Sequence, residues 1–95
     1  MNVPAELDGA KVIMYIENDK RPFLIMKFEE DDGSQKEVPI TRMAIAKYEN
    51  GKGYYLFLCD MNWEVQNDFD FDSIEEAIHC ASKSFEVKIN DWNNF

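Results

Sequence analysis

The sequence predicts one α+β domain, in which an antiparallel meander of four to five strands precedes one C-terminal helix packed on one face of the sheet. Apolar and β-branched stretches alternate with turn signals from Lys11 to Asp70, and a capped amphipathic segment follows them. No linker rich in Gly, Ser or Pro divides the 95 residues. Because a chain of this length supports one hydrophobic core, we expect residues 1–95 to form one domain.

The first strands follow from apolar stretches separated by turn residues. Asp32-Gly33 is a strong hairpin signal between two extended segments, because both residues tolerate the positive φ of a tight turn. Pro39 predicts an edge position or a bulge, since proline cannot donate to a strand ladder. We therefore expect strands at residues 11–17, 23–28 and 35–40.

Residues 41–48 fit two structures. Thr41 could cap a short helix, yet Asn50-Gly51 is a hairpin signal that needs a strand on each side, and we favour a strand. Residues 54–59 are apolar at successive positions, which predicts a central strand covered on both faces.

The next strand shows a period of two. Trp63, Val65, Asn67 and Phe69 are expected to point inward, and Glu64, Gln66, Asp68 and Asp70 outward. This pattern predicts a half-exposed strand with an acidic outer face.

The clearest element is the helix that begins after Ser73. Ser73 and Glu76 fit a capping box, in which the Ser73 hydroxyl accepts from the Glu76 amide and the Glu76 carboxylate accepts from the Ser73 amide. His79 and Lys83 fall on the side opposite the apolar stripe. That stripe contains Ile74, Ala77, Ile78, Ala81 and Phe85. The tail, residues 86–95, carries enough apolar area that we expect it to dock on the domain.

The charge is strongly negative and unevenly distributed. Nineteen acidic residues against ten basic ones give a net charge of −9, and residues 60–95 account for −7 of it. Such a surface repels phosphate backbones and anionic lipids, so nucleic acid and membranes are not expected partners. No apolar run approaches the roughly 20 residues of a membrane-spanning helix. The start lacks the basic and apolar regions of a secretory signal, so we expect a cytoplasmic protein.

Catalytic and metal-binding patterns are weak. Cys59 and Cys80 are expected to be free, unreactive thiols, and His79, the only histidine, lies on the expected solvent face. Residues 68–73 resemble the opening of a calcium loop, but Ser73 replaces its glycine and His79 its final glutamate. We therefore expect no enzyme activity, cofactor or metal.

The aromatic content exceeds what one helix would cover. Several strands are apolar on both faces, so we expect either the C-terminal tail or another protein chain to cover the second face, and we favour a homodimer. The acidic third and the aromatic face supply the candidate partner-binding residues Tyr55, Trp63, Glu64, Asp68, Asp70 and Asp72.

The C-terminal part also carries a resemblance. Trp63-x-Val65, the run from Phe71 to Ala77, and the closing Asp91-Trp92 pair resemble the C-terminal halves of small uncharacterised bacterial α+β proteins. The resemblance implies a strand-strand-helix unit and a bacterial origin. Some small acidic bacterial domains of this build are immunity proteins, which neutralise toxins.

The sequence favours a small acidic, non-enzymatic module that binds another protein. One form of this function is the neutralisation of a toxin, in which the acidic surface binds a basic partner. The alternative is a small-ligand or enzymatic site in a pocket between sheet and helix, lined by Tyr15, Tyr55 or Trp63. A third possibility is a purely structural role as a subunit of a larger assembly.

Overall fold

The strands and the helix form where the apolar periodicity places them. The computed structural model describes residues 3–95. Residues 1–2, at the start of the chain where no secretory signal is expected, lie outside the described residues. The elements are β1 (Glu6–Leu7), β2 (Ala10–Glu17), β3 (Leu24–Glu29), β4 (Gln35–Ile40), β5 (Arg42–Lys47), β6 (Tyr54–Cys59), β7 (Val65–Phe71), α1 (Ile74–Phe85), the 3-10 turn η1 (Ile89–Asp91) and β8 (Asn93–Asn94). The predicted α+β class is confirmed, and residues 42–47 form a strand as favoured.

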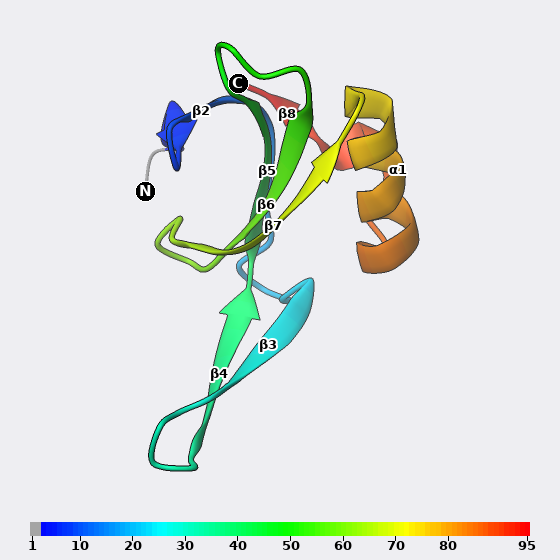
Figure 1. The fold of residues 1–95 in the computed structure, drawn as a ribbon. Coiled ribbons are helices and arrows are strands. Elements are labelled where there is room, and N and C mark those ends of the chain that lie inside the picture. The colour runs from blue at the N-terminus through cyan, green and yellow to red at the C-terminus, as the bar shows by residue number, and fades with distance from the viewer. Residues whose placement is uncertain (1–2) are drawn as a thin grey trace.

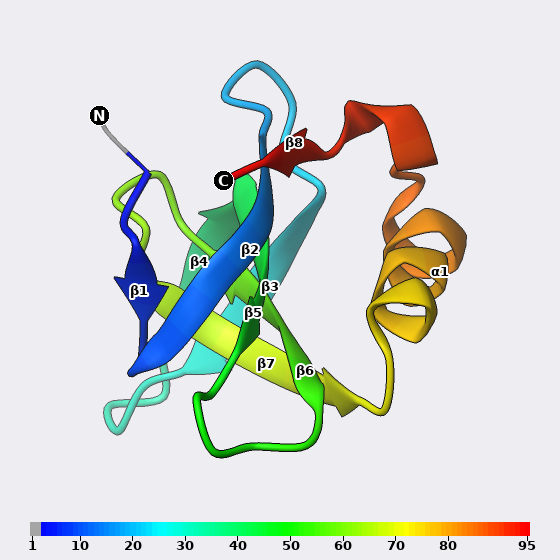
Figure 2. The same cartoon turned by 90° about the horizontal axis from the view of Figure 1, so that it is seen from above.

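The main sheet is antiparallel and curled. Its strands run in the order β1-β2-β5-β6-β7, and β8 adds to β2 (Figure 1). The meander is continuous from β5 to β7, whereas β2 pairs with β5 and not with β3, the next strand along the chain. The helix α1 follows the last long strand and contacts β6 and β7 (Figure 2).

Strands β3 and β4 form a separate two-stranded arm that extends away from the main sheet (Figure 1). The predicted hairpin at Asp32-Gly33 is confirmed: Gly33 has a φ of 87°, and the amide of Glu30 donates to the carbonyl of Ser34 at 2.8 Å. Pro39 lies on an edge as predicted, because each strand of a two-stranded arm has an unpaired side.

Two apolar clusters lie on opposite faces of the main sheet. The helix face is the side on which Leu56 and Leu58 of β6 pack with Ala77 and Ala81 of α1. The far face is the other side, where Phe57 is buried in the second cluster. That cluster comprises Leu7, Ala10, Val12, Ala44, Ala46, Phe57, Cys59 and Trp63. Strand β6 is therefore buried on both faces over Leu56–Cys59, which confirms its predicted central position.

The helix begins as predicted, with one difference in its cap. The Ser73 hydroxyl accepts a 3.2 Å hydrogen bond from the Glu76 amide. The Glu76 carboxylate, however, accepts from the amide of Asp72 at 3.1 Å and not from that of Ser73 as expected. His79 and Lys83 are exposed as predicted.

The tail docks through two of its four apolar side chains. Val87 and Trp92 are buried in the cluster on the helix face, whereas Ile89 and Phe95 are 67% and 55% exposed. The backbone beyond Trp92 pairs with β2, and the amide of Phe95 donates to the carbonyl of Ile13 at 3.0 Å. The predicted docking is confirmed.

The two edges of the main sheet differ. Strand β1 pairs with the first residues of β2, and β8 pairs with Met14 and Tyr15 further along it. Within residues 3–95 no strand pairs with the outer side of β7, although β7 is seven residues long. Short strands thus pair along the outer side of β2, whereas the outer side of β7 is open, with no strand among the described residues paired to it.

Candidate functional site

The open strand β7 presents its aspartates to the far face of the sheet. Asp68 lies opposite Phe57 and Asp70 opposite Tyr55, so their side chains share the far face with those aromatic rings. Both aspartates are exposed. Three of the six predicted partner-binding residues, Tyr55, Asp68 and Asp70, are therefore brought together.

A β-bulge sets this arrangement and corrects the predicted alternation. Leu58 pairs with Asn67 but Cys59 pairs with Val65, so one extra residue is inserted in β7 at Gln66. Because the bulge changes the phase of the strand, Val65 lies on the far face and Asn67 on the helix face. The prediction that these two residues share one inward face is wrong. Phe69, also expected to point inward, is 40% exposed.

Two tyrosines lie beside these aspartates. The rings of Tyr48 and Tyr55 meet edge to face with their centres 5.1 Å apart, and Tyr55 stacks on Phe57 at 6.0 Å. Both tyrosines are half-buried. We call Tyr48, Tyr55, Asp68 and Asp70 the far-face patch.

The patch is electronegative. The hydroxyl of Tyr48 donates a 2.8 Å hydrogen bond to the carbonyl of Asp8, which fixes the ring against the β1–β2 turn. Burial raises the pKa of Tyr48, and the charges of Asp8, Tyr55 and Asp68 raise it further. The carboxylates of Asp8 and Asp68 therefore oppose an added negative charge at this ring.

The outer backbone of β7 is partly occupied by its own side chains. The amide of Asp68 donates to the side chain of Asn67 at 2.9 Å, and just beyond β7 the amide of Asp72 donates to the side chain of Glu76 in α1. Such contacts hinder the addition of a further strand. Recognition at this edge therefore falls mainly to side chains.

Trp63 is buried and does not belong to the exposed surface. Its side chain is only 6% exposed, and its backbone has a φ of 61° in the turn before β7. The guanidinium carbon of Arg42 lies 5.6 Å from the centre of the Trp63 ring. The same guanidinium contacts Glu17 at 3.5 Å and Asp19 at 3.1 Å. Trp63 therefore offers a partner little surface, because its ring packs against an internal arginine, and its contact with a partner stays a prediction.

Glu64 and Asp72 lie at the two ends of β7, outside the far-face patch. Glu64 is exposed and lines a groove of about 460 Å³ between the arm and the turn that follows β6. Asp72 is exposed in the link to α1. The structure thus separates these two predicted residues from the other acidic ones.

The space between sheet and helix is filled by the cluster on the helix face. The residues expected to line a pocket there, Tyr15, Tyr55 and Trp63, pack instead with the cluster on the far face. The alternative site is therefore not formed by these residues, because the register of their strands turns them away from α1.

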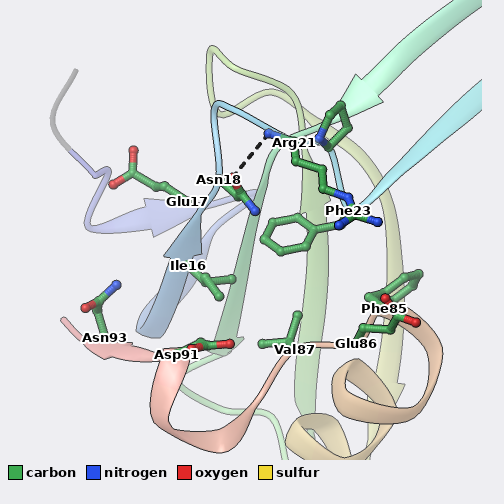
Figure 3. A pocket seen from close by; sticks show the side chains of 11 residues that line it. Ile16, Glu17, Asn18, Arg21, Phe23, Phe85, Glu86, Val87, Asp91 and Asn93 are labelled. Atoms are coloured by element: carbon green, nitrogen blue, oxygen red, sulfur yellow. Dashed lines mark hydrogen bonds between the residues drawn. The ribbon is translucent and has the colours of Figure 1, made fainter.

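A groove of about 420 Å³ opens beside the C-terminal end of α1 (Figure 3). Ile16, Phe23 and Val87 form its apolar wall, and Arg21 and Asp91 reach it from opposite sides (Figure 3). Both charged side chains are exposed, and the Asp91 carboxylate accepts a 3.0 Å hydrogen bond from the amide of Lys88. It offers a small polar ligand a shallow surface.

The cysteines are free, as predicted, and Cys59 is fully buried in β6. Burial raises the pKa of Cys59 to about 12, so its thiol is protonated and unreactive at neutral pH. Within residues 3–95, no group of three or more His, Cys, Asp or Glu side chains is placed to hold a metal ion. None of the described helices has the length and apolarity needed to cross a membrane.

Comparison of the chain with family models, curated proteins and solved structures finds no match. Sequence reasoning missed Tyr48 and Asp8, which complete the surroundings of the patch. Asp8-Gly9 is a hairpin signal of the kind recognised at Asp32-Gly33, and it could have placed β1 and this turn.

Proposed function

We propose that the protein is a small acidic, non-enzymatic module that binds a basic protein. The observation that carries this proposal is the open strand β7, which exposes Asp68 and Asp70 beside two half-buried tyrosines. From residue 60 to residue 82 the chain has seven acidic residues and no lysine or arginine. An acidic surface of this kind accelerates encounter with a basic partner and discourages acidic ones.

One form of this function is the neutralisation of a toxin, in the manner of immunity proteins. A toxin that acts on nucleic acid needs a basic cleft, and a surface of carboxylates complements such a cleft. The resemblance of the C-terminal part to small bacterial domains supports this form by analogy.

The alternative function is the binding of a small ligand. The observation in its favour is the groove beside the end of α1, where Arg21 and Asp91 flank an apolar wall (Figure 3). Binding that is lost on substitution of Arg21 and Asp91, and kept on substitution of the β7 aspartates, would favour this alternative.

The test compares two double variants of equal charge. Asp68→Asn with Asp70→Asn neutralises the β7 surface, whereas Glu29→Gln with Glu30→Gln neutralises two exposed carboxylates of the distant arm. A protein captured with the wild type is purified, and its affinity is measured at low and moderate salt. We expect the β7 variant to lose about tenfold or more in affinity and the arm variant much less. Equal losses, or a partner without basic character, would overturn the proposal.

A further inference from the structure

The protein already contains a binding site for an arginine, formed by its own residues. Arg42 lies over the Trp63 ring, and carboxylates of Glu17 and Asp19 contact its guanidinium. An aromatic ring and two carboxylates therefore hold one arginine at the far face of this sheet. Cation–π attraction and charge-assisted hydrogen bonds both contribute to such a site.

The far-face patch has the same composition without a cation. The rings of Tyr48 and Tyr55 lie beside the strand that carries Asp68 and Asp70. Within residues 3–95, the ion pairs that the structure shows join Arg42 to Glu17 and to Asp19. None of them involves Asp68 or Asp70. The carboxylates of Asp68 and Asp70 are thus exposed to solvent.

We infer that the far-face patch is a docking surface for an arginine side chain of the basic partner, with the guanidinium against the tyrosines and its N–H groups toward Asp68 and Asp70. This inference rests on the proposed function. Arginine is favoured over lysine because its planar guanidinium can stack on a ring while it donates to two carboxylates, whereas an ammonium group is a more strongly hydrated point charge.

A second copy of the chain is a poor occupant of this surface. Two copies joined at β7 would bring Asp68 and Asp70 of one chain toward the same carboxylates of the other, and like charges across a strand pair are destabilising. The amide of Asp68 also already donates to the side chain of Asn67, and that of Asp72, just beyond β7, to the side chain of Glu76. The patch therefore selects a basic partner and opposes self-association.

The experiment uses the capped tripeptide glycyl-arginyl-glycine as the probe. Its binding is followed by the amide shifts of β6 and β7 in NMR titrations, beside the same tripeptide with lysine or with uncharged citrulline in place of arginine. We expect millimolar binding with shifts centred on Tyr55, Asp68 and Asp70, about threefold weaker binding with lysine, and none with citrulline.

Variants separate the patch from general attraction. Asp68→Asn with Asp70→Asn should weaken arginine binding at least fivefold, and Glu29→Gln with Glu30→Gln should change it less than twofold. Tyr55→Leu removes the ring and should weaken arginine binding about threefold, and an unchanged spectrum outside the patch verifies the fold. Shifts centred on another surface, or equal binding of arginine and citrulline, would overturn the inference.

The two proposals fail differently. A purified basic partner that depends on Asp68 and Asp70, combined with an arginine peptide that does not bind the patch, would overturn the arginine site and leave the proposed function standing. An arginine peptide that binds the patch, combined with a partner whose affinity does not depend on Asp68 and Asp70, would overturn the proposal that the β7 surface binds the partner.

Discussion

The guanidinium carbon of Arg42 lies 5.6 Å from the centre of the Trp63 ring, where it joins the start of β5 to the turn before β7. The side chain of Arg42 is 7% exposed, whereas its partner Asp19 is largely solvated. The contact is thus an apolar and cationic packing interaction as much as an ion pair. It stabilises the turn from which the open strand begins.

Arg42→Ala should lower the free energy of unfolding by about 2 kcal/mol, because it removes buried methylene groups and the cation over Trp63. Arg21→Ala, at an exposed arginine, should change it by less than about 0.5 kcal/mol. Urea denaturation followed by tryptophan fluorescence measures both. Similar values for the two variants would show that the Arg42 contact adds nothing to stability.

Ser73→Ala should cost about 1 kcal/mol, since the Glu76 amide then loses its acceptor at the first turn of α1. Ser82→Ala is the matched control, because Ser82 is exposed within the same helix. Thermal unfolding followed by circular dichroism compares them. A loss at Ser82 as large as that at Ser73 would contradict the capping role.

The stability of the protein should fall at alkaline pH because of Cys59. Burial raises the pKa of its thiol from 9.0 to about 12, so the unfolded chain releases this proton first. The contribution of this thiol to the free energy of unfolding is fully present below pH 9.0 and is lost as the pH rises toward 12. The loss is at most about 1.4 kcal/mol per pH unit. Unfolding of the wild type and Cys59→Ala under reducing conditions, at pH values on both sides of 9.0, measures the difference. Parallel pH profiles would show that the thiol does not contribute.

The homodimer expected from the sequence stays a prediction, and the structure favours the competing prediction of a monomer. The second sheet face was expected to need another chain, and the described residues cover much of it with Leu7, Phe57 and Trp63. The acidic β7 edge also opposes self-pairing. We therefore expect light scattering coupled to size exclusion to give the monomer mass of 11.2 kDa. A mass twice as large that persists on dilution and at moderate salt would restore the dimer.

Local patterns were sufficient for most individual elements. The alternation of β2, the turn at Asp32-Gly33 and the cap at Ser73 are each determined by residues close together in sequence. Asn50-Gly51 correctly predicted strands on both sides, although the connection spans more than a two-residue turn and Gly51 does not adopt a positive φ. A turn signal thus indicates a reversal more securely than it indicates turn geometry.

Strand order depended on contacts that no local pattern contains. Strand β2 pairs with β5 and not with its sequence neighbour β3, and only Thr41 separates β4 from β5. The two-residue strands β1 and β8 are too short to show a period. They exist because β2 offers them an edge.

The candidate site was predictable in composition and not in geometry. Tyr55, Asp68 and Asp70 were identified from aromatic and acidic content, but the phase of β7 depends on the bulge at Gln66. The alternation placed Trp63 inward, as the structure has it, but it gave no indication that the Trp63 ring contacts Arg42. Register and burial come from tertiary packing, which a pattern of alternating residues does not specify.

The closure of the β2 edge has a consequence for how the chain folds. Tyr15 and Asn93 meet although they are 78 positions apart, so this is one of the most distant pairings in the chain. Loop closure over such a distance is entropically costly and belongs late in folding. Until it occurs, half of β2 is an unprotected strand edge, and a partly folded chain is most prone to aggregate there.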